Sequence, residues 1–224
     1  MISVIKSDLS ITEIVKCIDT NTVLVDIRYY KRNPNAVFSP YFPIGDVPIR
    51  YSAPDTAVSL AAMMEGLRVS SSAKAINLDR FSENNYFRLK EDAKRQTIGF
   101  LRGAYGTKIL SSTEAFQCLL IPTYKWILEF KLNNYITSLR KINETKKILI
   151  IEYSNKTPYD GEYTTGELLR SYILGIPPYE DVFDEVVTYI CKTNHKRIYC
   201  VEKKIKRVPK PIQPLCQERT LQFE

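Results

Sequence analysis

The stretch KKILIIEYS at residues 146–154 limits most tightly what this chain can fold into. It is a continuous run of apolar and β-branched residues, which is typical of a β-strand buried on both faces. The strand ends in a carboxylate, Glu152, and runs into a polar loop that holds Asp160. Strand ends that open into loops are common positions for functional side chains, so both acids are candidate ligand-binding residues. Acids in loops are nevertheless more often simply solvated.

Helical patterns occupy most of the remaining sequence. Apolar side chains recur at helical spacing, and Ser/Thr-x-x-Glu capping boxes begin at Ser111 and Thr164. Pro122 should kink or split the long helix that follows Ser111. We expect helices over residues 10–19, from Asp55 or Thr56 to Val69, and over 85–103, 112–142, 166–175 and 177–192, with strands over 22–30, 146–154 and 197–205.

These elements predict an α+β fold, a mostly helical single domain with a small sheet and a basic C-terminal extension. A length of 224 residues is sufficient for one substantial domain. We expect the α+β domain over residues 1–175, including an N-terminal helix and strand. A helix and strand over residues 176–202 should pack on it, and a basic, proline-rich tail should follow over residues 203–224.

Several classes of function leave no trace in this sequence. It has no G-x-G-x-x-G, P-loop, H-E-x-x-H or C-x-x-C motif, and its single histidine, His195, rules out His-based zinc sites and Ser-His-Asp chemistry. No apolar run nears the roughly 20 residues that span a membrane, and the N-terminus lacks a signal-peptide pattern. With five scattered cysteines, this predicts a cytoplasmic, reducing compartment and no membrane partner.

The net charge of +7 is concentrated near the C-terminus. Between Lys192 and Lys210, eight Lys or Arg residues face a single acid, Glu202, so this stretch accounts for the whole net charge. Such a surplus can bind nucleic acid or another acidic surface. Lysines that protect a strand edge from pairing are an equally good interpretation. The residues expected to contact a nucleic acid or protein partner are Lys203, Lys204, Lys206 and Arg207.

The segment SLAAMMEGLR at residues 59–68 is mostly small or apolar, yet it carries Glu65 and Arg68 three residues apart. Side chains at this spacing share a helix face. A buried acid is costly unless it is paired, so the two side chains either pair with each other or line a cleft. In a cleft, Arg68 would bind phosphate, and Glu65 would be the catalytic residue of a glycosidic-bond reaction, by orienting water or stabilising a ribosyl cation.

The segment YKWILEF at residues 124–130 offers a further candidate group. Tyr124, Lys125 and Trp126 can stack on a ring and contact phosphate. Trp126 and Phe130 lie four residues apart, however, and aromatic pairs at this spacing belong to the core more often than to a site.

Five segments, in this order, resemble an uncharacterised family found mainly in bacteria: FSPYFP (38–43), SLAAMMEGLRV (59–69), RQTIGFLRGAYGTKIL (95–110), PTYKWILEFKL (122–132) and ILIIEYSN (148–155). That family in turn resembles a remote branch of the NADAR, or YbiA-like, superfamily. The likeness covers about residues 24–175. It implies a mostly helical α+β fold, cleavage of N-glycosidic bonds in ADP-ribosyl and phosphoribosyl compounds, and no metal or organic cofactor.

Superfamily members open on an F-S-N-F-Y-P-like segment and continue with a helix of the form V-E-H-A-Y-Q-A-x-K. The helix glutamate, expected to do the chemistry, falls at Ala61, one turn before Glu65 at the glutamine position. The closing D-x-x-W-G-x-G motif is missing, and residues 160–161 resemble it only loosely. The residues that match are Phe38, Ser39 and Pro43 in the opening segment, with Arg68 in place of the helix lysine.

The resemblance leads to the hypothesis of a pocket for an ADP-ribose or ribosyl-phosphate group. Purified protein should then bind ADP-ribose, and Arg68→Ala should weaken binding. The residues expected to bind the ligand are Phe38, Ser39, Arg68, Arg102, Trp126, Glu152 and Asp160, with Glu65 catalytic if the protein is an N-glycosidase.

A second hypothesis is a catalytically degenerate copy of this fold that serves as a structural or interaction protein. The basic tail would then dock on a partner or on nucleic acid. Abundant Lys, Asn, Ile and Tyr indicate an AT-rich genome, such as that of a large DNA virus, for which the virion would be a location. A sequence-reading nucleic-acid module is disfavoured, because no base-reading motif is present.

Overall fold

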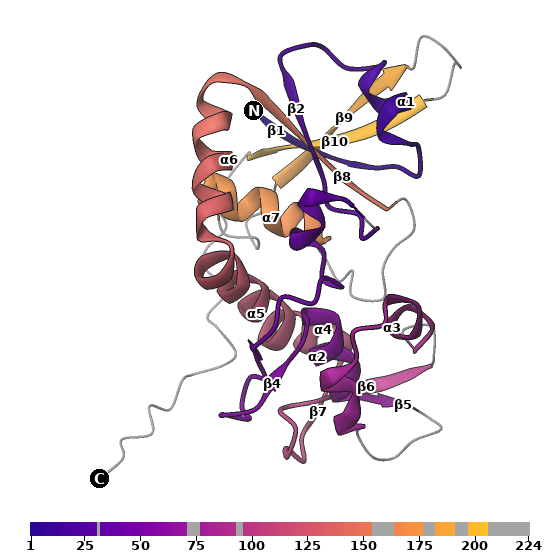
Figure 1. The fold of residues 1–224 in the computed structure, drawn as a ribbon, viewed down its shortest axis with the longest axis vertical. Coiled ribbons are helices and arrows are strands. Elements are labelled where there is room, and N and C mark those ends of the chain that lie inside the picture. Colours follow the sequence, from indigo (N-terminus) through magenta and orange to yellow (C-terminus); the bar gives the residue numbers. More distant parts are fainter. Residues whose placement is uncertain are drawn as a thin grey trace.

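The apolar run at residues 146–154 forms β8 (Lys147–Glu152), which lies inside a five-stranded sheet (Figure 1). Two parallel strands flank it, β2 (Thr22–Asp26) and β1 (Ile2–Lys6). The sheet continues from β1 through the antiparallel strands β10 (Arg197–Ile205) and β9 (Val182–Ile190). The structure, a computed structural model, describes residues 1–30, 32–70, 77–92, 96–153 and 164–176, and the backbone of residues 182–190 and 197–205.

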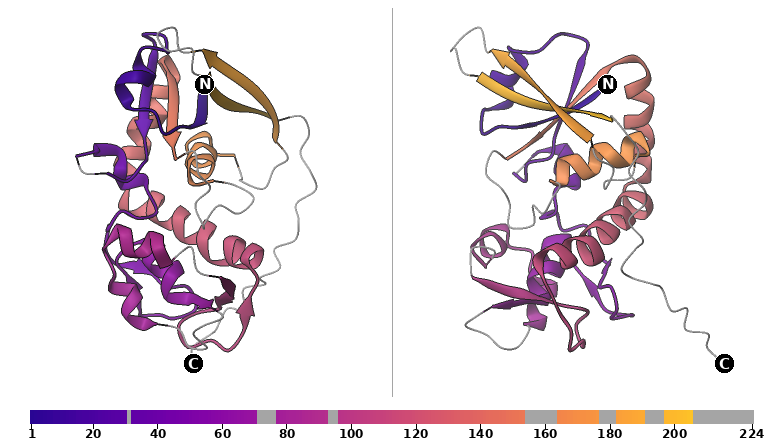
Figure 2. Two further views of the ribbon diagram at one scale, coloured as in Figure 1. Left: turned by 90° about the vertical axis from the view of Figure 1, so that its right-hand side faces the viewer. Right: turned by 180° about the vertical axis from the view of Figure 1, so that it is seen from behind.

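Both faces of β8 are buried, as its sequence predicts. Ile148 and Ile150 belong to the main core, on the face covered by α6 (Asn133–Thr145) and α7 (Thr165–Leu174). Leu149 and Ile151 belong to a second cluster that includes Ile14 of α1 (Ile11–Val15). The alternation follows the two-residue period of a strand. In the right-hand view of Figure 2, α7 lies between the sheet and α5.

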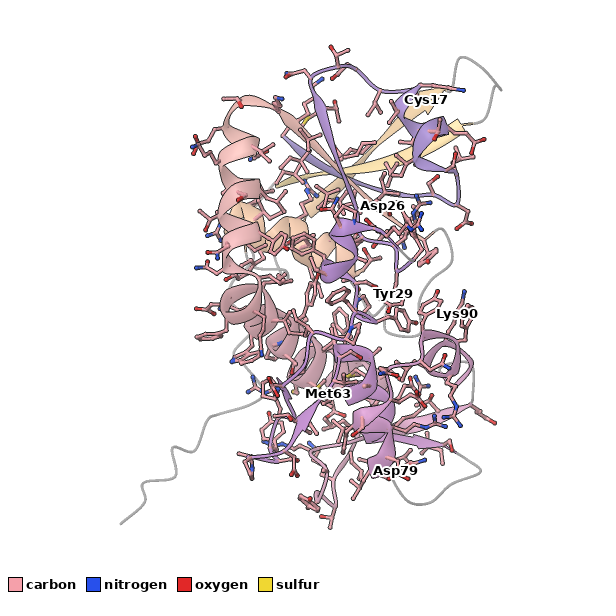
Figure 3. All side chains as sticks on the ribbon, in the orientation of Figure 1. Cys17, Asp26, Tyr29, Met63, Asp79 and Lys90 are labelled. Atoms are coloured by element: carbon pink, nitrogen blue, oxygen red, sulfur yellow. The ribbon has the colours of Figure 1, made fainter. Side chains whose placement is uncertain are left out.

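The chain between β2 and α6 forms the other half of the molecule (Figure 1). One core cluster runs through both halves, and Met63, labelled in Figure 3, is one of its fully buried members. The elements of this half are η1 (Pro34–Phe38), β3 (Val47–Pro48), β4 (Thr56–Ala57), α2 (Leu60–Leu67), β5 (Arg68–Ser70), η2 (Leu78–Ser82), α3 (Tyr86–Asp92), β6 (Thr97–Leu101), β7 (Ile109–Leu110) and α4 (Ser112–Ala115).

A long helical path then returns to the sheet. It passes from α4 through a π-helical turn, η3 (Phe116–Leu120), into α5 (Ile121–Trp126), a second π-helical turn, η4 (Ile127–Lys131), and α6. Pro122 was expected to kink or split this helix, and it marks the passage from π to α geometry at the start of α5. The wider π-helical turn accommodates a residue that has no amide hydrogen to donate.

The helix that carries Glu65 begins later than the sequence suggested. Neither Asp55 nor Thr56 caps it, because Thr56 lies in β4. The cap is Ser59, whose Oγ accepts a hydrogen bond from the backbone N–H of Ala62 at 3.0 Å. The helix ends at residue 67, and the chain continues directly into β5.

Two further predicted helices were partly or wholly wrong. Residues 85–103 form α3 only as far as residue 92, and residues 97–101 form β6, which pairs with β5 and β7. Residues 182–190, predicted as helix, form β9, which pairs with β10 along its whole length. In both segments pairing with a neighbouring strand overrides a local helical pattern, and the run of β-branched residues in 182–190 suits a strand. The strand β1 was not predicted at all.

The fold class is therefore α+β, with more helix than strand among the described residues, as predicted. The predicted capping boxes at Ser111 and Thr164 both form, a third that was not predicted forms at Ser10, and the strand predicted over residues 197–205 is β10. Within the described ranges, no helix combines the length and the apolarity needed to cross a membrane.

Candidate functional site

Glu65 and Arg68 form a buried ion pair with each other. The Nη2 of Arg68 lies 2.6 Å from the Oε1 of Glu65, and the two side chains are only 6% and 2% exposed. The same guanidinium donates a hydrogen bond to the hydroxyl of Thr97 on β6 and lies 5.4 Å from the ring centre of Phe100. The sequence left open whether this pair is closed or lines a cleft. The geometry favours the closed pair, and a catalytic role for Glu65 remains an untested prediction.

Other predicted residues are spread over the molecule. The guanidinium of Arg102 stacks on the ring of Tyr51, 4.4 Å from its centre. Phe38 is 1% exposed, and its carbonyl oxygen accepts a hydrogen bond from the Tyr124 hydroxyl at 2.8 Å. Lys203 and Lys204 belong to β10. Asp160, Lys206 and Arg207 lie outside the described residues.

Two predicted residues do come together, at the carboxyl end of the parallel strands. Glu152 ends β8, and its Oε2 accepts the backbone N–H of Gly166 in the first turn of α7 at 3.0 Å. Ser39 and Glu152 both line a cavity of about 20 Å³. That volume is sufficient for about one water molecule, so this cavity is too small for a sugar phosphate.

Sequence reasoning missed a second buried ion pair at the same edge of the sheet. Asp26 ends β2 and binds the guanidinium of Arg28 through both carboxylate oxygens, at 2.8 and 2.7 Å. Arg28 also donates to the carbonyl oxygens of Ser7 and Leu9, at 3.1 and 2.7 Å. The pair thereby ties the end of β2 to the segment after β1. The signal that would have found it is the Asp-x-Arg pattern at a strand end, where both side chains fall on one face.

Tyrosines fill the space beside this edge. The Tyr153 hydroxyl donates to the carbonyl oxygen of Tyr29 at 2.9 Å, and the rings of Tyr29 and Tyr86 lie 5.2 Å apart. Lys90 of α3 lies 5.7 Å from the ring centres of both Tyr86 and Tyr153. Figure 3 shows Asp26, Tyr29 and Lys90 in the region where the sheet meets the other half of the molecule. Burial, together with a hydrogen bond to Tyr86, raises the pKa of the Tyr153 hydroxyl.

Trp126 borders a different and larger cavity, which we call the Trp126 cavity. Its volume is about 330 Å³. The ring of Trp126 is partly buried against the core, and the ring of Phe130 lies 5.5 Å from it. Phe130 is 65% exposed, so for this residue the interpretation as core was wrong. The cavity is lined by Pro48, Arg50, Pro122, Thr123, Lys125, Trp126, Glu129 and Phe130.

The polar groups of the Trp126 cavity are not engaged with one another. Within the described part of the chain, neither the guanidinium of Arg50 nor the ammonium of Lys125 makes a hydrogen bond or an ion pair. Thr123 is 1% exposed, and its hydroxyl has no hydrogen-bond partner among the described residues. Buried hydroxyls nearly always have a partner, so this one indicates a group or a water molecule that the cavity receives. The carboxylate of Glu129 stands exposed at the rim.

A second cavity of about 470 Å³, which we call the α7 cavity, lies on the other side of α5. Tyr124 and Leu128 line it from the long helical path, and Leu168 and Tyr172 line it from α7. Pro122 and Lys125 border both cavities. The ridge between them is therefore the exposed edge of α5.

Residues 7–164 match the model of a family of unknown function, DUF6939. The chain belongs to this family. No curated protein matches the chain, and no solved structure does so either. The DUF6939 match includes every residue of the Trp126 cavity, whereas the α7 wall of the second cavity lies beyond its end.

Proposed function

We propose that this DUF6939 protein binds a ribosyl-phosphate compound of the nucleotide class in the Trp126 cavity, and that it does not cleave it. The observation that carries the proposal is the 330 Å³ cavity in which two cations without a hydrogen-bond or ion-pair partner in the described chain lie beside an aromatic pair. The guanidinium of Arg50 contacts the ring of Tyr51, 5.5 Å from its centre. Ligand sites are commonly cavities of this size, with apolar walls and a few convergent polar groups.

Arg50 and Lys125 would bind the phosphate. An arginine presents two parallel N–H donors to phosphate oxygens, and a lysine adds a compact charge. Both side chains line the same cavity, and no acid among the described residues neutralises either one. A phosphate is therefore the group that this wall is best suited to receive.

Trp126 and Phe130 would stack on the base. Their rings are 5.5 Å apart and inclined by 33°, and Phe130 is largely open to solvent. An exposed aromatic pair of this kind binds a flat ring, and stacking contributes about 1–3 kcal/mol per base. The sequence pointed to Tyr124, Lys125 and Trp126 as a stacking and phosphate-binding group. Lys125 and Trp126 line this cavity, whereas Tyr124 lines the α7 cavity.

Glu129 and Thr123 would contact the sugar. A carboxylate accepts hydrogen bonds from ribose hydroxyls, and the Thr123 hydroxyl can donate to or accept from one more polar atom. The ligand would thus satisfy a buried hydroxyl that has no partner in the described protein. The resemblance to the NADAR superfamily supports the same class of ligand.

The absence of cleavage rests on α2. The position where the resemblance implies a catalytic glutamate is Ala61, which is completely buried. The nearest carboxylate on that helix, Glu65, is held by Arg68 under packed side chains. We therefore assign binding to this protein, and we assign no hydrolytic role to Glu65.

The test is calorimetry with ADP-ribose as the probe, with ribose 5-phosphate and adenosine as its two halves. Arg50→Met and Lys125→Met should each weaken ADP-ribose and ribose 5-phosphate by about tenfold, because each removes a charge-assisted hydrogen bond. Trp126→Ala should weaken ADP-ribose and adenosine but leave ribose 5-phosphate unchanged. Chromatography of the same mixtures should show intact ADP-ribose after prolonged incubation.

Lys16→Met is the matched control, since Lys16 caps α1 at the opposite end of the molecule (Figure 1). It removes the same charge and should leave every affinity unchanged. Binding that none of the cavity variants weakens, or the release of a free base or of ribose, would contradict the proposal.

A further inference from the structure

We infer that the α7 cavity is a second, separate binding site, for a small amphipathic carboxylate such as a medium-chain fatty acid. This goes beyond the nucleotide site, with which it shares only the Pro122–Lys125 edge of α5. The cavity has a volume of about 470 Å³, which is within the range of small-molecule sites.

The inner wall of the cavity is apolar. Ile121 and Leu128 line it from the long helical path, and Leu168 and Ile176 line it from α7 and the turn that follows. Tyr124 presents only its ring, because its hydroxyl already donates to the carbonyl oxygen of Phe38. A hydrocarbon chain fits such a wall, because the burial of each methylene group is favourable and leaves no polar group of the protein without a hydrogen bond.

The rim of the cavity is basic. Arg140 of α6 donates from Nε to the carbonyl oxygen of Ile173 at 3.2 Å and from Nη2 to that of Tyr172 at 3.0 Å. Two hydrogen bonds and the Tyr172 ring, 5.4 Å from the guanidinium carbon, hold the side chain in place. Among the described residues its Nη1 makes no hydrogen bond, and neither does the ammonium of Lys125. Both groups line the cavity, and we assign both to the carboxylate of the ligand.

The combination selects the occupant. No Asp or Glu is among the residues that line this cavity in the described chain, so an anionic head group meets no carboxylate within it. The wall also lacks the pair of exposed, stacked rings that marks the Trp126 cavity. A ligand with one negative charge at the end of an apolar chain would bind the basic rim with its charged group and the apolar inner wall with its chain.

Calorimetry with hexanoate, octanoate and decanoate tests the site. Affinity should rise about fourfold for each added methylene while the chain still enters the apolar wall. Arg140→Gln and Lys125→Gln should each weaken octanoate by about tenfold, because each removes a charged donor. Neither should change the affinity for octanol, which has the same chain without the charge.

Lys16→Gln is again the control for charge, and it should change nothing. Arg140 also holds the end of α7, so Arg140→Gln can loosen the fold, and Lys125→Gln then carries the test because its side chain makes no hydrogen bond in the described chain. Arg50→Met should leave octanoate binding unchanged, which separates this site from the nucleotide site. Affinity that is flat with chain length, or equal for wild type and Lys125→Gln, overturns the inference.

Discussion

The charged side chains in the described part of this protein are of two kinds: some form ion pairs within the protein, and others have no ion-pair partner. Glu65 with Arg68, and Asp26 with Arg28, form buried ion pairs, and each arginine also donates a hydrogen bond to a segment distant in the sequence. Arg50, by contrast, borders a cavity with no ion-pair partner in the described chain. Arginines of the first kind are already paired with an acid, whereas cations of the second kind retain their capacity to bind an external anion.

Breaking the Glu65–Arg68 pair should destabilise the fold. Arg68→Met removes the positive charge beside the buried carboxylate of Glu65, which should lower the free energy of unfolding by about 3–5 kcal/mol. The double variant Glu65→Leu/Arg68→Met should recover most of this loss, because it removes both charges. Urea denaturation measures both effects.

Lys108→Met provides the comparison, since the Lys108–Glu114 pair is about half exposed. Its loss should destabilise the fold far less than the loss of Arg68, because solvent screens an exposed ion pair. A double variant as unstable as Arg68→Met alone would argue against a purely structural pair.

Gly166 is the residue that lets α7 approach Glu152. A Cβ atom at this position would lie 2.8 Å from the Oε2 of Glu152 and 2.8 Å from a methyl group of Val4. Gly166→Ala should therefore lower the free energy of unfolding by about 1–3 kcal/mol, as overpacking does. Ser171→Ala, in the same helix, should cost less than about 0.5 kcal/mol. Equal stability of the two variants in urea would contradict this close packing.

The sequence located the Glu65–Arg68 pair but could not decide its role. The spacing of the two residues follows from α2 alone. The position of Arg68 beside Glu65 also depends on its contacts with Thr97 and Phe100. Both residues belong to β6, which lies far from α2 along the chain. Contacts between distant segments leave no pattern in the local sequence. The sequence alone therefore could not decide whether the two side chains bind each other or line a cleft.

At the scale of elements, strands buried on both faces and capped helices were predictable, and strands set by pairing were not. The apolar run of β8 and the capping boxes at Ser111 and Thr164 act locally. β9 and β6 carry helical patterns, but each forms a strand because a partner strand lies alongside. The start of α2 was misplaced for a similar reason, since β4 takes the residues that resembled its cap.

Two tyrosines that join elements should make the fold sensitive to alkali. Burial raises the pKa of the Tyr124 hydroxyl far above its ordinary value, and the charge of Glu152 adds to the effect. In the unfolded chain a tyrosine loses its proton near pH 10. Above that pH the unfolded chain binds fewer protons than the folded one, so the free energy of unfolding must fall as pH rises, by up to about 1.4 kcal/mol per pH unit for Tyr124. The raised pKa of Tyr153 acts in the same direction.

The measurement is urea denaturation below and above pH 10 for wild type and Tyr124→Phe. Below pH 10 the variant should be less stable by about 1 kcal/mol, because it loses the hydrogen bond to the carbonyl oxygen of Phe38. Above pH 10 its stability should decline less steeply than that of the wild type. Identical slopes would show that the Tyr124 hydroxyl is not the buried titrating group.

At the scale of the whole molecule, α5 is the element around which the candidate sites are arranged. It carries Tyr124 toward the core beneath the sheet, Trp126 toward one cavity and Lys125 to the ridge between two cavities. Three of the segments that carried the resemblance to an uncharacterised bacterial family, around residues 38–43, 122–132 and 148–155, lie close together there: the Tyr124 hydroxyl donates to the carbonyl oxygen of Phe38, and the charge of Glu152 acts on that hydroxyl. The 59–69 segment instead places its polar pair against β6.

The antiparallel strands should be required for the sheet to remain stable. β10 pairs with β1, so removal of residues 177–224 would uncover the edge of β1. We expect that truncation to lower the thermal midpoint by about 5 °C or more and to promote self-association through the open edge. Removal of residues 206–224 alone, which leaves β9 and β10 intact, should change the midpoint little. Equal midpoints for the two truncations, measured by circular dichroism, would contradict the pairing.

The central claim is that Trp126 borders a nucleotide site, and Trp126 is the only tryptophan in the chain. Its fluorescence during titration with ADP-ribose is therefore the most direct measurement. The account predicts a saturable change in emission that Arg50→Met shifts to about tenfold higher ligand concentration. Emission that stays constant up to millimolar ADP-ribose, while the protein remains folded, would contradict the account.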